Sequence, residues 1–371
     1  MKKITIKNTV LYISFSGLVA FSCLQFIKDL SPQDTLAKIY NKLFVADEEV
    51  FVVSDQFPWE NVGLYRRLFA NDVSGEPISR EDVIRVFGVH VEGFGDGGVV
   101  EQNVGSGQYE GTHFQEGVFE SYDSVAIPFL EIFPRDFDSN MVYPTVVLFS
   151  GHGSMRQVAF DETSYQGGLG VLLSEEGFLV FVMENRGMGK LVHLGDHMRI
   201  DAVARMLGGS WYGEITTDAL WCIEMANQRN YSGKLGVGGV STGGALSLLT
   251  SALDVRIVAS YVQGYLGSYK TTFGSRGNHH ECNNISNIIG EFDMDDIAKM
   301  IYPRSAVYVN GQLDGFYAED AASAFESIEK RYMSGGHPDK VAFHSPAGVG
   351  HELSTSLALE YFKSVLIDGG E

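Results

Sequence analysis

The fold is decided by the stretch Lys234-Leu-Gly-Val-Gly-Gly-Val-Ser-Thr-Gly-Gly-Ala-Leu-Ser-Leu-Leu249. A short β-rich run leads into Ser241 and a run rich in Ala and Leu follows it, which predicts a strand, a sharp turn and a helix. Gly239 and Gly243 flank the turn, and small residues there let the serine hydroxyl stand clear of the backbone. Because G-x-S-x-G also arises by chance, the strand and helix around it are needed to interpret Ser241 as a nucleophile.

Two later segments supply candidates for the acid and the base that a nucleophilic serine requires. Asp314 lies in a loop after an apolar run that begins at Ser305. His351 follows a short apolar run and a Pro/Gly-rich loop, and it precedes a helical run over residues 353–366. Loops at strand ends gather functional groups in open α/β sheets, and Ser, Asp, His is one of the chain orders in which triads occur. We therefore predict a triad of Ser241, His351 and Asp314.

Backbone amides for an oxyanion hole are predicted at two places. The continuous apolar run Thr145–Phe149 is typical of a central parallel strand, and it ends in the glycine-rich loop Ser150–Ser154. We assign one donor to the amide of Ser154, with Gly153 as the alternative. The other donor is the amide of Thr242, the residue after the nucleophile.

Several further segments share the features of one superfamily. They are the strand pair at 124–134, Gly151-His-Gly153, Gly177–Gly189, the Ser241 turn, Ala252–Ala259, and Cys282-Asn-Asn ahead of Asp296–Arg304. With these segments, residues 122–366 resemble the α/β-hydrolase superfamily, and more narrowly its bacterial acetylxylan-esterase and dienelactone-hydrolase-like branch. Relatives usually have Asp in place of Glu184 and His or Tyr in place of Val240, differences that bear on the substrate and leave the chemistry unchanged.

The resemblance implies both a fold and an activity. The fold is a mostly parallel, doubly wound α/β sheet with helices on both faces and a lid insertion at about 264–302. The activity is that of a serine carboxylesterase that acts through an acyl-enzyme, needs no cofactor and removes short acyl groups, such as acetyl, from a small-molecule or glycan ester. A thioesterase or serine peptidase with the same triad is the alternative, and a non-catalytic binding protein on a retained fold is the third interpretation.

The lid segment bears on substrate size. Tyr265 and Tyr269 are predicted to contact the substrate from this segment. No long uninterrupted apolar stretch is present there, which favours short acyl groups over fatty acyl chains.

Histidine and cysteine residues invite a metal interpretation that we do not adopt. His279-His-Glu-Cys282 lacks a partner cluster at ligand spacing, and adjacent side chains rarely reach one ion, so no metal is expected. His152 is expected to brace its loop, because His351 already fits the role of base. Cys222 lies on an apolar helical face, which is typical of a buried free thiol, with a single bridge to Cys282 as the alternative.

Other charged residues are expected to have structural roles. Arg186 is predicted to fix the loop after its strand by charge-assisted bonds, with substrate contact as the alternative. Asp293, Glu319 and Asp320 stand at predicted helix starts, where negative charge is stabilised by the helix dipole.

Composition limits the partners. The chain has 371 residues, 44% of them hydrophobic, and a formal net charge of −20. It can therefore build the core of one large catalytic domain. Nucleic acids and anionic membrane surfaces require clustered Lys and Arg, which the sequence does not show beyond its first residues. Neutral substrates are favoured, and nucleic acid is excluded as a partner.

Residues 1–27 are interpreted as a targeting segment. A basic start with Lys2 and Lys3 precedes the apolar stretch Val10–Leu24, the layout of a secretory signal. The segment is either cleaved before Cys23, lipidated at Cys23, or retained as a membrane anchor. We expect the rest of the chain to be extracytoplasmic, as a periplasmic, secreted or membrane-anchored protein.

Residues 28–117 are predicted to be an extension that precedes the catalytic domain at 118–371. Ser79-Arg-Glu-Asp82 resembles a capping box that begins a helix. Gly93–Gly117 is rich in glycine and shows no helical period, so we interpret it as either a pair of edge hairpins or a mobile flap.

Overall fold

The computed structural model describes residues 4–6, 9–11, 77–92, 98–275 and 281–369. The chain divides into two units, residues 1–66 and 67–371. In the first unit, β1 (Ile4–Ile6) and β2 (Thr9–Leu11) pair antiparallel, and the rest of the predicted targeting segment lies outside the described residues. Among the described residues, no helix has both the length and the apolar character needed to cross a bilayer.

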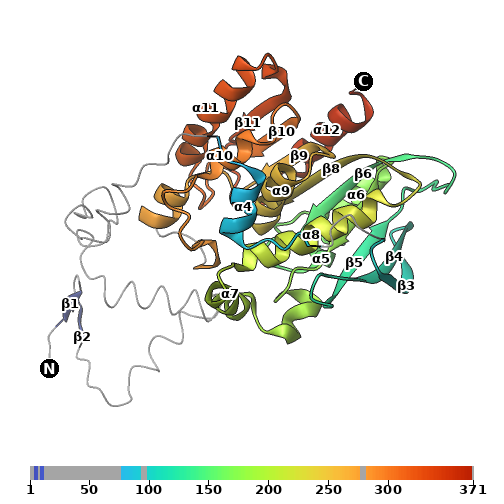
Figure 1. Cartoon of the computed structure of the whole chain (residues 1–371), viewed down its shortest axis with the longest axis horizontal. Coiled ribbons are helices and arrows are strands. Elements are labelled where there is room, and N and C mark those ends of the chain that lie inside the picture. The colour runs from blue at the N-terminus through green and yellow to red at the C-terminus, as the bar shows by residue number, and fades with distance from the viewer. Residues whose placement is uncertain (1–3, 7–8, 12–76, 93–97, 276–280, 370–371) are drawn as a thin grey trace. The chain divides into compact units, whose positions relative to one another are not determined.

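One sheet of nine strands organises the second unit (Figure 1). Its strand order is β11-β10-β9-β8-β6-β7-β5-β4-β3. The six strands from β6 to β11 run parallel, and β3, β4 and β5 add an antiparallel edge. The strands span β3 Glu101–Tyr109, β4 Thr112–Glu120, β5 Ala126–Ile132, β6 Tyr143–Phe149, β7 Leu179–Met183, β8 Ser232–Val240, β9 Ile257–Gln263, β10 Ser305–Val309 and β11 Val341–His344.

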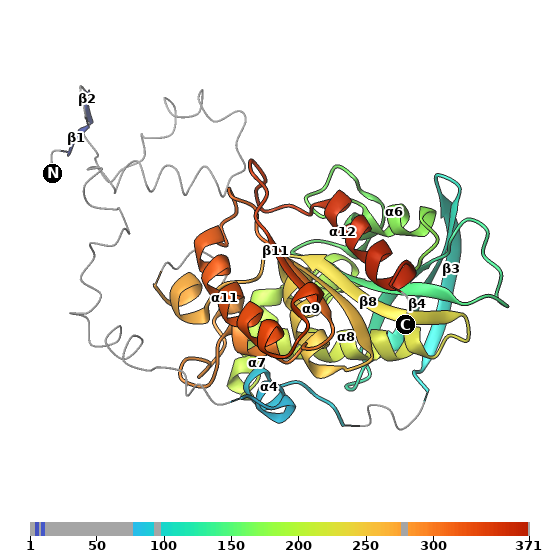
Figure 2. The same ribbon diagram turned by 90° about the horizontal axis from the view of Figure 1, so that it is seen from above.

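Helices cover both faces of this sheet, which confirms the predicted doubly wound α/β fold. Figure 2 shows α6 and α12 on one face and α4, α8 and α9 on the other. The regular helices are α4 Arg80–Phe87, α5 Met155–Phe160, α6 Leu169–Glu175, α7 His197–Met206, α8 Trp211–Asn227, α9 Thr242–Leu253, α10 Met294–Lys299, α11 Ala318–Ser334 and α12 Thr355–Phe362. Shorter helical turns are η3 Gly189–Leu194, η4 Tyr269–Ser275, η5 Glu281–Asn283, η6 Pro338–Lys340 and η7 Lys363–Ile367.

Strand β6 shows why the central strands read as continuous apolar runs. Its side chains alternate between two cores: Val147 and Phe149 pack with the residues of α8 and α9, whereas Val146 and Leu148 pack with those of α5, α6 and α12. Because helices cover both faces, both sets of side chains are apolar. The centre of the sheet is therefore buried on both faces, and polar groups lie in the loops that follow the strands.

The N-terminal boundary differs from the predicted one. The division at 117/118 passes through β4, which pairs with β3 and β5 in the main sheet, and the compact unit begins at residue 67. The hairpin interpretation of Gly93–Gly117 fits β3 and β4, while residues 93–97 lie outside the described part. The capping box at α4 is confirmed: the Asp82 amide donates to Ser79 Oγ at 3.2 Å, and the Ser79 amide donates to Asp82 Oδ2 at 3.0 Å.

Candidate active site

Ser241 occupies a strained turn between β8 and α9. Its φ of 63° and ψ of −126° lie in a region that residues other than glycine rarely adopt. A Cβ on either Gly239 or Gly243 would collide with the Phe149 carbonyl oxygen of β6. The two glycines are therefore required because the turn passes directly against the neighbouring strand.

Asp314 and His351 meet across the loops that follow β10 and β11. His351 Nδ1 lies 2.8 Å from Asp314 Oδ1. The aspartate side chain is 1% exposed and the imidazole 30%, so the carboxylate is buried and the imidazole is partly open to solvent. The Phe316 amide donates to the same Oδ1 at 2.8 Å, which fixes the carboxylate. This arrangement can hold one imidazole tautomer, with the Nδ1 proton directed at the acid.

Two aromatic rings hold the imidazole plane, and sequence reasoning missed both. Tyr165 and Phe316 each lie with ring centroids 6.1 Å from that of His351, at interplanar angles of 17° and 10°. Tyr165 is part of the segment between α5 and α6, more than 180 residues from His351 in the chain. No local sequence pattern marks it, because its role arises from tertiary packing alone.

The serine and the Asp–His pair meet at the end of β9. The Ser241 amide donates to the Gln263 carbonyl at 2.9 Å, and Gly264 follows at once. A Cβ on Gly264 would lie 3.1 Å from both Asp314 Oδ2 and His351 Cε1. Within the described part of the chain, no hydrogen bond joins the Ser241 hydroxyl to His351. Such bonds are often long in unliganded sites and shorten when a substrate binds.

The predicted oxyanion loop needs one correction. The Ser154 amide, the first predicted donor, is engaged by Gln157 Oε1 at 2.9 Å because Ser154 caps α5. The Gly151 amide is likewise engaged by Gln166 Oε1 at 2.6 Å. Among the described residues, the Gly153 amide has no acceptor, so the alternative donor is the better placed one.

Thr242, the second predicted donor, is the first residue of α9. The first amides of a helix have no acceptor within it, so this amide can bind an oxyanion. Its side chain contacts both the Ser150–Ser154 loop and α8: Thr242 Oγ1 lies 3.2 Å from His152 Nδ1 and 3.4 Å from the Tyr212 hydroxyl. The contact agrees with the bracing role expected for His152.

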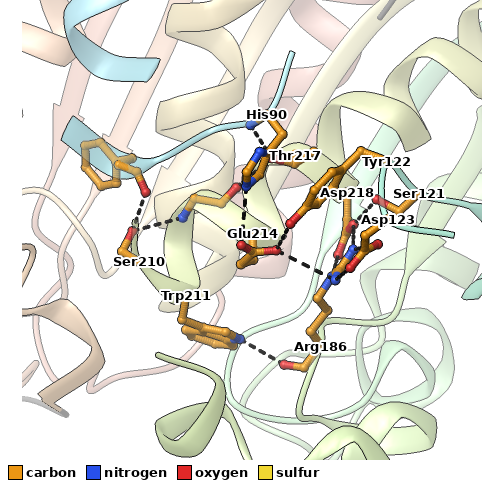
Figure 3. Close-up of polar contacts among 12 residues, drawn as sticks. His90, Ser121, Tyr122, Asp123, Arg186, Ser210, Trp211, Glu214, Thr217 and Asp218 are labelled. Atoms are coloured by element: carbon orange, nitrogen blue, oxygen red, sulfur yellow. Dashed lines mark hydrogen bonds and ion pairs between the residues drawn. The ribbon is translucent and has the colours of Figure 1, made fainter. Parts of the chain in front are cut away.

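Arg186 lies in a buried charge network after β7 (Figure 3). Its Nε and Nη2 donate to Asp218 at 2.7 and 2.9 Å, and its Nη1 and Nη2 donate to Asp123 at 2.5 and 2.8 Å. Burial raises the pKa of Asp218, and the attraction of Arg186 acts in the opposite direction. The expected charge-assisted bonds are confirmed, and the guanidinium is turned toward these carboxylates.

Tyr265 and Tyr269, the predicted substrate contacts, lie in the core. They are 1% and 2% exposed and pack with the rings of Phe273 and Phe316. Burial raises the pKa of both phenols. The lid aromatic residues thus fill space beside His351, and these two hydroxyls are not presented at an open surface. The sequence pattern could not distinguish an aromatic core from an aromatic pocket.

The helix-start acids lie as expected. Asp293 caps α10 in a capping box with Asp296, while Glu319 and Asp320 occupy the first turn of α11. Asp320 Oδ2 accepts a hydrogen bond from Thr272 Oγ1 at 3.0 Å. The carboxylate that lies at hydrogen-bond distance from His351 is that of Asp314, in the loop before α11.

Both described cysteines are buried free thiols, as predicted for Cys222. Burial raises the pKa of Cys282 to about 12. Its side chain lies near His152 and His197, and the ligand atoms of these three residues are within 4.8 Å of one another. His279 and His280 of the discounted pattern lie outside the described residues.

Comparison with known proteins identifies the fold. No protein-family model and no curated protein matches the sequence. Among solved structures, a putative acetyl xylan esterase from Bacteroides fragilis superimposes with a TM-score of 0.63 at 15% identity, covering 77% of this chain and 86% of its own. Acetyl xylan esterase 1 from Thermoanaerobacterium sp. gives 0.57 at 18% identity, covering 81% and 98%.

A glucuronoyl esterase from Solibacter usitatus is also similar, with a TM-score of 0.55 at 12% identity, covering 77% of this chain and 91% of its own. At such identities the likeness concerns the fold. The chain therefore has the α/β-hydrolase fold that the sequence resemblance implied.

Proposed function

We propose that the chain is a serine carboxylester hydrolase that removes short acyl groups through an acyl-enzyme. The observation that carries the proposal is the 2.8 Å contact between His351 and Asp314, packed against Gly264 beside the strained Ser241 turn. A structural histidine needs neither a buried carboxylate partner nor a neighbouring serine held in a costly conformation. The fold of the similar esterases supports the same choice.

In the first half of the reaction His351 Nε2 accepts the Ser241 proton while Oγ attacks the ester carbonyl carbon. The carbonyl π electrons move to the oxygen, and Asp314 stabilises the imidazolium that has formed. The tetrahedral species then collapses, the C–O bond of the alcohol breaks, and the leaving alcohol takes the proton from His351. Water repeats these steps on the acyl-enzyme and restores the serine.

The oxyanion is stabilised by the amides of Thr242 and Gly153 in this proposal. One donor of this kind contributes roughly 3–4 kcal/mol to lowering the barrier. The Ser154 amide can join them if Gln157 Oε1 turns away, since that oxygen now accepts its bond. Both glycine-rich turns lie at the carboxyl ends of adjacent parallel strands, β6 and β8, where their amides can converge.

The packing beside His351 supports a short acyl group. Phe316 stacks on the His351 imidazole. On its other contacts the Phe316 ring packs against the rings of Tyr265 and Phe273, with centroids 5.4 Å apart in both pairs. A long acyl chain would have to displace this cluster. An acetyl group is small enough to make no such demand, which supports acetyl esters of a glycan or a small molecule as substrates.

The basic and apolar N-terminal segment supports action outside the cytoplasm, with attachment to the membrane through that segment or a lipidated Cys23.

A panel of p-nitrophenyl acetate, butyrate, octanoate and palmitate, with acetylated xylan, a thioester and a prolyl peptide beside them, tests the proposal. We expect kcat/KM to be highest for acetate and to fall as the acyl chain lengthens. In an apolar acyl pocket each added methylene would instead strengthen transition-state binding by about 1 kcal/mol or more, and kcat/KM would rise with chain length.

A maximum at octanoate or beyond would contradict the short-acyl proposal. A thioester or peptide turned over faster than every ester would identify the alternative hydrolases that share this triad. The Ser241→Ala protein serves as the control for contaminating esterases in each assay.

A further inference from the structure

We propose that His152, His197 and Cys282 form a binding site for one Zn²⁺ ion that connects the oxyanion loop to the lid. The three residues come from separate segments: the Ser150–Ser154 loop, the first turn of α7, and η5. Their ligand atoms all lie within 4.8 Å of one another. The site does not depend on the proposed ester hydrolysis, because its evidence is the position of the ligands.

The distance between the sulfur and one imidazole nitrogen fits a shared tetrahedral ion. Cys282 Sγ lies 3.7 Å from His152 Nε2. A Zn²⁺ ion with a Zn–S bond of about 2.3 Å and a Zn–N bond of about 2.0 Å separates sulfur and nitrogen by about 3.5 Å at the tetrahedral angle. The His152 and His197 rings meet edge to face with centroids 4.7 Å apart, so small side-chain shifts can bring the third ligand to bonding distance.

The other nitrogen of His152 has the partner that a metal-bound histidine needs. Nδ1 lies 3.2 Å from Thr242 Oγ1, and Nε2 faces the sulfur. Metal-binding histidines generally donate their second ring N–H to an oxygen, which fixes the tautomer and the ring orientation. Thr242 Oγ1 in turn lies 3.4 Å from the Tyr212 hydroxyl, which donates to Asn283 Oδ1 at 3.0 Å.

The ligand types select the metal. Two imidazoles and one thiolate suit Zn²⁺, whereas Mg²⁺ and Ca²⁺ require oxygen ligands. Asp201, a buried carboxylate on α7, is held by Arg205 and by the Trp211 amide at 2.9 Å, so we do not count it as a ligand. The fourth position is left for water, and the Cys282 thiol releases its proton to solvent when the ion binds.

Binding would hold the lid turn η5 against the oxyanion loop. His152 lies between Gly151 and Gly153, and Cys282 is the middle residue of η5, which precedes α10 in the chain. Metal binding to the folded state alone stabilises that state by mass action. We therefore expect Zn²⁺ to raise the melting temperature of the protein.

Equilibrium dialysis of the purified full-length chain against micromolar Zn²⁺, followed by elemental analysis, tests the proposal. We expect one bound Zn²⁺ per chain. Cys282→Ser and His197→Asn should each weaken binding at least about 100-fold, the upper end of what loss of an outer-shell partner costs. Cys222→Ser is the matched control, because Cys222 is also a buried free thiol, and it should bind as the parent chain does.

Cobalt gives a second readout that does not depend on the stability of a variant. Co²⁺ bound by Cys282 should show a thiolate-to-cobalt charge-transfer band in the parent chain and in Cys222→Ser. Thr242→Val should weaken Zn²⁺ binding by about 10-fold or more, since it removes the acceptor for His152 Nδ1–H. Absence of the charge-transfer band from the parent chain, or equal Zn²⁺ affinity in the parent chain and folded Cys282→Ser, would overturn the proposal.

Discussion

The loop after β7 and the loops after β8, β10 and β11 carry polar groups at the same edge of the sheet, yet they are built in opposite ways. Around Arg186 all three guanidinium nitrogens donate to carboxylates, and the side chain is buried (Figure 3). Around Ser241 the backbone is strained, and the imidazole of His351 is partly exposed to solvent. Both regions thus lie at the same edge of the sheet, whereas they differ in backbone strain and in the burial of the central side chain.

The difference separates a structural cluster from the cluster that we propose to be reactive. In the Arg186 region Asp123 and Asp218 compensate the buried positive charge, and their bonds to Arg186 hold the loop in place. In the Ser241 region the strain lowers stability and persists because Gly239 and Gly243 allow the turn against β6. We expect substitutions in the first region to affect unfolding and substitutions in the second to affect turnover.

The largest effect is expected for Ser241→Ala. Removal of the nucleophile should lower kcat for p-nitrophenyl acetate by about a million-fold. The melting temperature should remain within a few degrees of that of the parent chain, because alanine and serine both carry a Cβ and adopt this backbone conformation at a similar cost. Initial rates on purified protein, together with thermal unfolding followed by circular dichroism, measure both. Activity within tenfold of the parent chain would remove Ser241 from the mechanism.

Asp314→Asn is expected to come second. The variant keeps the shape of the side chain and loses the charge that orients His351, so kcat should fall by about ten-thousand-fold. Glu319→Gln is the matched control, because Glu319 lies in the first turn of α11 and should leave kcat within about twofold. Steady-state kinetics of both proteins decides the matter, and the reverse ranking would assign the orienting acid to α11.

Arg186→Met tests the other side of the comparison. It leaves Asp218 buried without its cation, and breaking such a pair costs about 3–5 kcal/mol in the free energy of unfolding. Arg135→Met is the control, since Arg135 pairs with Glu175 on the surface and should cost less than about 1 kcal/mol. Urea unfolding of both variants gives the two values. Equal losses would show that the buried network does not stabilise its loop.

Residues close in sequence to a turn motif could be predicted, and residues brought together by packing could not. The Ser241 turn was accessible because Gly239 and Gly243 must flank it at fixed spacing. Asp314 and His351 were accessible because each follows a strand in the expected chain order. Central parallel strands could be predicted from apolar runs such as Thr145–Phe149, which have no polar face, and the doubly wound sheet followed from the resemblance to the α/β-hydrolase superfamily.

The supporting contacts escaped prediction for a physical reason. Engagement of the Ser154 amide by Gln157 depends on where α5 begins, and the rings of Tyr165 and Phe316 reach His351 from distant segments. The proximity of His152 to Cys282, which are 130 residues apart, has no spacing signal at all. Tyr265 was placed in the wrong environment because aromatic residues line cores and pockets alike.

The central claim, that Ser241 is a nucleophile activated by its neighbours, is tested most directly by covalent labelling. The purified chain is treated with a fluorophosphonate, and the adduct is located by mass spectrometry of its peptides. We predict one adduct per chain, on Ser241, and at least a hundredfold slower labelling in Asp314→Asn. An adduct on another residue, or no adduct in a preparation that hydrolyses p-nitrophenyl acetate, would contradict the account.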